Sequence, residues 1–188
     1  FLAVGMTSCY EDYVYDYEYS TAGFIMKKPL RTVIADRDME IYVGVSIGGK
    51  REVDRNDWAT FVIDPDLIPR GYAVMPENYY VLSDPSTMRV RKDNLPVADV
   101  GIKFTDDFYN DDVATTSWYA LPIRITGSSL DSIGNAETVV AIKFISTFHG
   151  TYYIKGKMEM WDIGKDSLMN TVTYNDKDLI KNITRDSR

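Results

Sequence analysis

The stretch Met39-Glu40-Ile41-Tyr42-Val43-Gly44-Val45-Ser46-Ile47, followed by Gly48-Gly49, decides the fold class of this chain. Apolar residues at the odd positions alternate with polar, small or amphipathic residues at the even ones. This period of two is typical of a strand that buries one face. The glycine pair is typical of a turn. The stretch therefore predicts a half-buried β-strand.

Further short apolar or alternating runs follow the same plan along the chain. They predict strands at 58–63, 79–82, 88–90, 100–104, 118–125 and 138–145. Turn-forming residues such as Asp64-Pro65 and Asp84-Pro85 separate them. The best helical candidate, 106–113, is short and rich in aspartate. Short strands with little helix predict an all-β fold, an antiparallel β-sandwich with few or no helices.

The chain divides into three predicted parts. Its 188 residues, 45% of them hydrophobic, can bury a sizeable core. We predict a sandwich domain over 20–147, because the strand runs before residue 146 already suffice for one. A new alternating run starts at Thr151, so residues 148–188 are predicted to begin a truncated second β-rich domain. At this point it stays open whether they instead add strands to the first sheet.

The N-terminal part, residues 1–19, predicts attachment to a membrane through a lipid. Phe1 to Met6 form an apolar remnant of a signal peptide, and Met6-Thr7-Ser8-Cys9 resembles the lipobox at which bacterial lipoproteins are cut and acylated. Acyl chains contribute about 0.8 kcal/mol per buried methylene, so more than one chain anchors a protein stably. A catalytic role for Cys9 would need a neighbouring base, and none is near it in the sequence. We therefore predict Cys9 as a lipidation site.

The segment directly behind Cys9 is acidic and rich in tyrosine. Residues 10–19 hold four acids and no base, and so supply −4 of the formal net charge of −7. Such a segment repels itself and predicts an extended tether, although its alternating tyrosines also fit the period of a strand. Acidic residues at this place resemble the export signal of Bacteroidetes surface lipoproteins. The predicted location is the outer membrane, at the cell surface and lipid-anchored. Because no Lys/Arg cluster is present, nucleic acid is not an expected partner.

Several strings together resemble a known family. They are Lys28-Pro29-Leu30-Arg31-Thr32-Val33-Ile34, Ile41-Tyr42-Val43-Gly44-Val45, Pro76-Glu77-Asn78-Tyr79-Tyr80 and Tyr119-Ala120-Leu121-Pro122-Ile123-Arg124-Ile125. Over about residues 20–147 the chain resembles an N-terminal domain of unknown function in Bacteroidetes surface lipoproteins, and the start at Gly150 resembles its usual C-terminal companion. The resemblance implies an immunoglobulin-like sandwich and an association with glycan-uptake systems of the outer membrane. It implies no catalytic residues.

The reactive residues argue against an enzyme. His149 is the single histidine and Cys9 the single cysteine, so neither a Ser-His-Asp set nor a zinc site is indicated. No pair of acids is marked as flanking a glycosidic bond. Asp106-Asp107 and Asp111-Asp112 could offer oxygen to calcium, yet they lack a glycine-punctuated loop, which favours a solvated acidic loop. We predict a protein that is no enzyme and has no cofactor or metal; a hydrolase or enzyme-accessory role is the weakest hypothesis.

The aromatic residues, 13% of the chain, suggest how a ligand could be bound. A sugar has an apolar face of CH groups that packs on an exposed ring, and Tyr and Trp offer such area with a polar tip. We favour Tyr72, Tyr79, Tyr80 and Tyr109, which lie near predicted loops. The competing interpretation is that these rings fill the core.

These observations leave two main hypotheses for function. The first is a non-catalytic lipoprotein module of the cell surface that binds or captures a glycan or other surface ligand, with outer-membrane uptake proteins as partners. The alternative is an adhesion or structural spacer domain without a small-ligand site. Asp131-Ser132-Ile133 and Asp166-Ser167-Leu168 match a short motif for O-glycosylation of exported Bacteroidetes proteins, so Ser132 and Ser167 are candidate sites.

Overall fold

We describe the protein from a computed structural model, which places residues 19–182 except 36, 50–55, 92–94, 115–116, 163 and 165. Cys9 and the acidic residues 10–18 lie outside the described residues. Within the described part, no helix is both long and apolar enough to cross a membrane.

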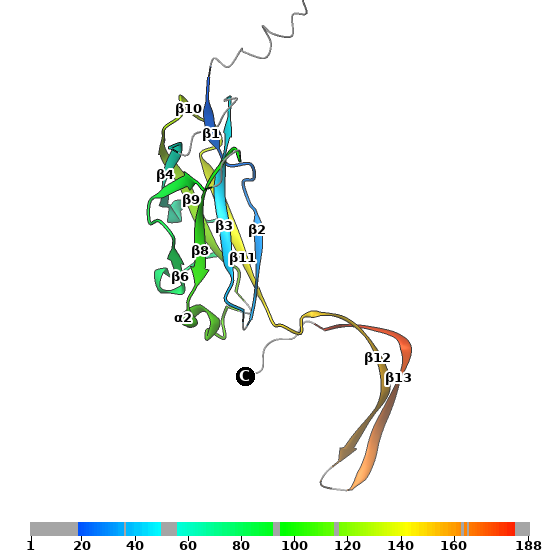
Figure 1. The fold of residues 1–188 in the computed structure, drawn as a ribbon. Coiled ribbons are helices and arrows are strands. Elements are labelled where there is room, and N and C mark those ends of the chain that lie inside the picture. The colour runs from blue at the N-terminus through cyan, green and yellow to red at the C-terminus, as the bar shows by residue number, and fades with distance from the viewer. Residues whose placement is uncertain are drawn as a thin grey trace, which may run out of the picture.

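Among the described residues, eleven strands form one sheet that curls into a β-sandwich (Figure 1). The order along it is β10-β1-β3-β8-β7-β4-β9-β11-β2, with β5 beside β9 and β6 beside β8. The strands are β1 Thr21–Gly23, β2 Leu30–Ile34, β3 Glu40–Gly48, β4 Trp58–Ile63, β5 Ala73–Val74, β6 Tyr80–Leu82, β7 Thr87–Val90, β8 Val97–Phe104, β9 Tyr119–Ser128, β10 Ser132–Ile133 and β11 Glu137–Ile145. The predicted all-β sandwich is confirmed.

The strand β7 joins the two layers of the sandwich. It pairs antiparallel with β4 through Trp58↔Arg89 and antiparallel with β8 through Val90↔Ala98. The layer of β3 and β8 is therefore hydrogen-bonded to the layer of β4, β9 and β11, and the sandwich is a single continuous sheet.

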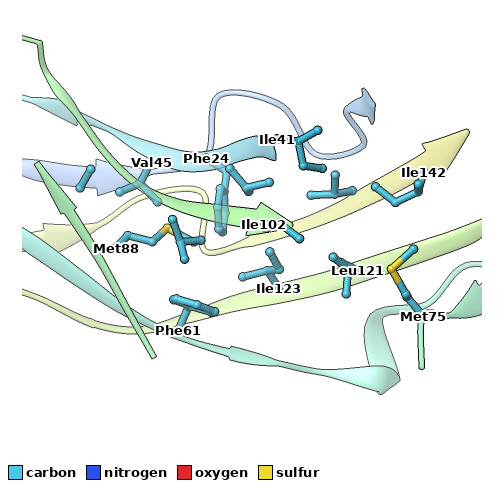
Figure 2. Packing of buried hydrophobic residues seen from close by; sticks show 14 of the residues in the cluster. Phe24, Ile41, Val45, Phe61, Met75, Met88, Ile102, Leu121, Ile123 and Ile142 are labelled. Carbon is cyan, nitrogen blue, oxygen red and sulfur yellow. The ribbon is translucent and has the colours of Figure 1, made fainter. Parts of the chain in front are cut away.

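The first strand read from the sequence, β3, has the burial pattern that its alternation predicts. Ile41, Val43, Val45 and Ile47 are buried, and the residues between them are exposed or half-buried. β3 pairs antiparallel with β8 over Glu40–Ser46 of its length. Figure 2 shows Val45 and Ile102 of this layer facing Phe61 and Ile123 of the other.

Most strand pairs are antiparallel, but three pairs that involve short or edge strands are parallel. These are β1 with β10, β5 with β9, and β2 with β11. The chain places β1 beside β3 in one layer and then crosses to place β2 beside β11 in the other. The crossing segment between β1 and β2 thus spans one side of the sandwich.

Helical structure is confined to short pieces in the described residues: η1 Pro65–Leu67, η2 Glu77–Tyr79 and α2 Asp106–Tyr109. The helix predicted over 106–113 ends after one turn. The carboxylate of Asp111 accepts a hydrogen bond from the backbone N–H of Val113 at 2.8 Å. Such local bonding by Asp offers the backbone an alternative to helix, which explains the early end.

The last two strands form a hairpin. β12 Gly150–Asp162 and β13 Ser167–Asn182 pair with each other, and Figure 1 shows the hairpin standing away from the sandwich. Its exposed large side chains are Tyr153, Met158, Met160, Trp161, Leu168 and Met169. An isolated two-stranded hairpin is marginally stable in water. The assignment of residues 148–188 to a second domain stays a prediction.

Candidate functional site

Aromatic side chains gather at the end of the sandwich that carries α2. The ring of Phe108, on α2, is fully buried and lies 4.9 Å from the ring of Phe104 and 5.2 Å from that of Phe144. The rings of Tyr109 and Tyr79 lie 5.6 and 6.0 Å from it. Phe108 therefore holds α2 and η2 against the ends of β8 and β11.

Two tyrosines of this end share one carboxylate. The hydroxyls of Tyr79 and Tyr119 each donate to Oδ2 of Asp111 at 3.0 Å, and their rings meet edge to face at 5.6 Å. Burial first, and then the hydrogen bond and charge of Asp111, raise the pKa of both hydroxyls. Tyr79, predicted as a ligand contact, thus has its hydroxyl bound within the protein.

The hydroxyl of Tyr109 also has a partner inside the fold. It donates to the backbone carbonyl of Arg37 at 2.9 Å, and the ring lies 5.9 Å from Phe144. Tyr80 is half-buried in β6, and burial raises the pKa of its hydroxyl. The hydrogen bond and the ring contact hold Tyr109 in the framework of this end, and Tyr80 packs against the core.

Tyr72, the fourth predicted tyrosine, lies beside a residue that the sequence did not mark as a ligand contact. Its ring meets that of Trp118 edge to face at 6.1 Å, and 45% of Trp118 is exposed. The backbone joins the two, because the N–H of Ala73 donates to the carbonyl of Trp118 at 3.0 Å. Within the described residues neither the Tyr72 hydroxyl nor the Trp118 indole N–H has a hydrogen-bond partner. Tyr72 thus differs from the other predicted tyrosines, because its ring contacts the exposed Trp118.

The signal for Trp118 lies in the sequence pair Trp118-Tyr119. Adjacent residues of an extended chain point to opposite sides, so one ring of such a pair turns inward. Here Tyr119 turns to Asp111, and Trp118 stays outside. The alternation of side chains alone could not show which ring of the pair turns inward, because β9 is buried on both faces from Ala120 to Ile123.

One further exposed tyrosine, Tyr42 on β3, has its ring covered. The guanidinium of Arg91 lies 3.8 Å from the ring centroid, and Arg91 also binds both carboxylate oxygens of Asp99. The Tyr42 hydroxyl donates to Oε2 of Glu40 at 2.7 Å. These contacts leave Tyr42 as part of a surface ion-pair network.

Two of the four acids considered for calcium, Asp107 and Asp111, bind protein groups. Asp107 accepts a hydrogen bond from the side-chain amide of Asn78 at 2.9 Å, and Asp111 accepts the two tyrosine hydroxyls. Across the part of the chain that the structure describes, no cluster of three or more His, Cys, Asp or Glu is arranged to hold a metal ion. His149 is half-buried in the link between β11 and β12, where its N–H donates to the carbonyl of Ser146.

Both candidate glycosylation serines are exposed. Ser132 lies on β10, and its hydroxyl donates to the carbonyl of Ser20 at 3.2 Å. Ser167 begins β13 next to Asp166, whose φ of 44° places it in the left-handed region. Modification of either serine stays a prediction.

Comparison with known proteins identifies a family. The family model that matches this chain, described as an N-terminal domain, covers residues 10–132, which is more than half of the chain. The chain matches no curated protein.

Three solved structures are similar to this chain. A Bacteroides ovatus protein of unknown function is 19% identical, with a TM-score of 0.68 over 85% of this chain and 62% of that one. A multidomain Bacteroides ovatus protein that includes DUF1735 is 15% identical, with a TM-score of 0.46 over 84% and 55%. EndoBT-3987 of Bacteroides thetaiotamicron, solved with Man5GlcNAc product, is 14% identical, with a TM-score of 0.46 over 73% and 34%. The first shares the fold of this chain. The chain spans less than two thirds of each of these structures.

Proposed function

We propose that this chain, which belongs to the family of N-terminal domains matched over residues 10–132, is a non-catalytic module of the cell surface that captures glycans. The outer membrane would hold it through a lipid on Cys9. The observation that carries the proposal is the pair of half-buried Tyr72 and exposed Trp118, with rings 6.1 Å apart and both polar tips unpaired within the described residues.

The chemistry of the Tyr72–Trp118 pair suits a sugar. An exposed indole accepts the apolar CH face of a pyranose, and an edge-to-face neighbour holds the indole in one orientation. The indole N–H can donate to a sugar hydroxyl, and the tyrosine hydroxyl can donate or accept. Arg70, two residues before Tyr72, is exposed and has no ion-pair partner among the described residues, which adds a further donor.

The proposal is non-catalytic, and it is supported by two carboxylates of the sandwich that bind protein groups. Asp111 accepts the hydroxyls of Tyr79 and Tyr119, and Asp64 is paired with Arg124 at 2.6 Å. Glycoside hydrolysis needs two carboxyl groups that face one scissile bond. Binding of a glycan without cleavage requires only an exposed aromatic surface and a few polar contacts.

The second candidate function, a spacer or adhesion domain, is favoured by the use of Tyr79 and Tyr109. Both hydroxyls are bound within the protein and both rings pack around Phe108. If Trp118 serves no ligand, the aromatic end is purely structural. The experiment below separates the two functions.

Glycan binding is tested by an array of bacterial and host polysaccharides, followed by titration of a positive glycan. We expect Trp118→Ala and Tyr72→Ala to weaken binding at least tenfold, equal to about 1.4 kcal/mol. The matched control is Trp161→Ala, which removes another exposed tryptophan, on the hairpin. An array without binding, or an equal loss in the control, would favour the spacer.

The lipid anchor is tested separately. Cells that express the full protein are grown with a labelled fatty acid, and the protein is recovered from the membrane fraction. We expect label on the protein and none on the Cys9→Ser variant. Label retained by Cys9→Ser would contradict the anchor and leave the glycan proposal unaffected.

A further inference from the structure

Part of the edge of β3 has no neighbouring strand. The N–H of Ile47 donates to the carbonyl of Pro96, so the backbone groups of the odd residues of β3 point toward β8. The even residues point to the other side, where β1 covers Ser46 and Gly48 and ends at Gly23. The backbone N–H and C=O groups of Tyr42 and Gly44 therefore face an open edge, and within the described residues they have no partner there.

The strand β2 presents a second open edge on the same side of the sandwich. The carbonyls of Lys27 and Pro29 accept hydrogen bonds from β11, so the alternate residues Leu30 and Thr32 point their backbone groups away from it. At the far end, the N–H of Ile34 is held by the sulfur of Met39 at 3.3 Å. Figure 1 shows β2 and β3 running beside each other with no strand between them.

A hollow of about 160 Å³ lies between these two edges. It is lined by Phe24, Ile25, Met26, Pro29, Arg31, Val43, Gly44 and Thr138. The crossing segment beside it leaves apolar side chains in water, since 76% of Ile25 and 56% of Met26 are exposed. We call the hollow and its two edges the β2–β3 seam. Exposed apolar side chains next to unpaired strand edges are the two elements of a strand-addition site.

The charge of the β2–β3 seam is positive. Arg31 is the charged residue that lines its hollow, while Lys27 and Lys28, directly before β2, line a second hollow together with Glu137. No acid among the described residues pairs with the side chains of these three cations. Elsewhere in the described chain, Arg89, Arg91 and Arg124 each have a carboxylate partner. Glu40 on β3 accepts a hydrogen bond from the Tyr42 hydroxyl.

We propose that the β2–β3 seam binds an extended, acidic segment of a partner protein as an added strand along Tyr42–Gly44 of β3. Backbone donors and acceptors at strand spacing recognise a peptide, whereas sugar hydroxyls have no such period. A carboxylate of the added strand would pair with Arg31, which lines the hollow. A second copy fits the seam less well, because edge-to-edge pairing would bring the cations of both copies together.

The test uses the full chain and a fluorescent, N-acetylated peptide in which valine and glutamate alternate. We expect saturable binding that weakens with salt, because the contacts include surface ion pairs. A matched peptide with lysine in place of glutamate should not bind. Methylation of alternate backbone nitrogens of the glutamate peptide should abolish binding, because it removes the donors of one strand edge and leaves the side chains in place.

Variants of the protein test the site itself. We expect Arg31→Glu to weaken binding at least tenfold, and Lys155→Glu, an exposed position on the hairpin, to leave it unchanged. Circular dichroism and the unfolding midpoint establish that each variant is folded. Absence of binding, or equal binding of the N-methylated peptide, would overturn the proposal.

The binding assay would also reveal two other possible occupants of the β2–β3 seam. A concentration-dependent dimer that competes with the peptide would assign the seam to a second copy. Binding that arises only after deletion of residues 10–18 would assign it to the chain's own acidic segment. Either result overturns the proposal of a partner protein. The proposal does not involve Trp118, so Trp118→Ala should bind the peptide normally.

Discussion

Ser20 and Asp131, 111 residues apart in the sequence, bind each other through three hydrogen bonds. The N–H and the hydroxyl of Ser20 donate to Oδ2 of Asp131 at 2.9 and 2.6 Å, and the N–H of Asp131 donates to the Ser20 hydroxyl at 3.2 Å. Ser20 is buried. The pair fixes the start of β1 to the start of β10, and so closes one end of the sheet.

The Ser20–Asp131 pair predicts a large effect for a small substitution. Ser20→Ala removes the hydroxyl that bonds a carboxylate, and hydrogen bonds to charged groups are each worth about 1.5–3 kcal/mol. We expect the free energy of unfolding to fall by about that amount in urea titration. The control Ser86→Ala removes an exposed hydroxyl whose contact is Thr87 at 3.3 Å, and should change stability by less than about 0.5 kcal/mol. Equal effects would show that the pair contributes nothing.

The hydrogen bond from Tyr119 to Asp111 predicts that the protein loses stability at alkaline pH. The pKa of Tyr119 is raised above its ordinary 10.0 by burial and by Asp111. Its stabilisation is therefore complete below pH 10.0 and is lost as the pH rises through the higher folded-state pKa. We expect Tyr119→Phe to be less stable than the natural chain at neutral pH and the difference to shrink in strong alkali. Tyrosinate absorbance and denaturation at each pH measure it, with the exposed Tyr153→Phe as control.

The pair of Asp64 and Arg124 predicts a dependence at the other end of the pH scale. The hydrogen bond from Arg124 lowers the pKa of Asp64 below 3.8, so the stabilisation is present above pH 3.8 and is lost as the pH falls through the folded-state pKa. We expect Asp64→Asn to be less stable at neutral pH and to match the natural chain in strong acid. Asp66→Asn, on the same turn, is the control in the same titration. A constant difference at every pH would exclude ionisation as the cause.

Two glycines predict stability losses of different size for the same substitution. A Cβ on Gly44 would lie 2.5 Å from the carbonyl oxygen of Ala98, whereas a Cβ on Gly156 would meet nothing within 4 Å. Gly44→Ala must therefore shift β3 against β8. We expect a loss of about 1–3 kcal/mol for Gly44→Ala and less than about 0.5 kcal/mol for Gly156→Ala. The denaturant midpoint measures both, and similar midpoints would mean that the strands move apart without cost.

The link between β11 and β12 predicts where a protease cuts. Phe148 lies there and is 72% exposed. We expect brief chymotrypsin treatment to cleave after Phe148 and to leave a fragment that contains all strands of the sandwich and unfolds at the same temperature as the whole chain. A fragment that unfolds on cleavage would show that the sandwich depends on the hairpin.

The sequence patterns located the central strands well because period-two alternation reports burial directly. The predicted run 58–63 corresponds to β4, and the run 39–47 lies within one residue of β3. The short strands β1, β5 and β10 were not predicted, because two or three residues carry no period. Their places depend on tertiary contacts such as that of Ser20 with Asp131. The edge strand β2 was not predicted either, and only one of its five residues is buried.

The candidate site was only partly predictable for a similar reason. Composition and loop position drew attention to Tyr72, Tyr79, Tyr80 and Tyr109 alike. What distinguishes them is whether a hydroxyl finds a partner, and the partner of Tyr79 is Asp111, 32 residues away. Nothing local in the sequence shows that Tyr72 lies against Trp118.

The parallel pairing of β2 with β11 has a mechanical consequence. β2 is one end of the sheet order and β11 is its neighbour, and Leu30–Ile34 runs in register with Ala141–Ile145. A pull applied at Leu30 draws β2 toward its start, while a pull applied at Ile145 draws β11 toward its end. Tension between the two ends therefore shears all five residue pairs together. A sheet loaded in this direction resists force far better than one that peels open bond by bond.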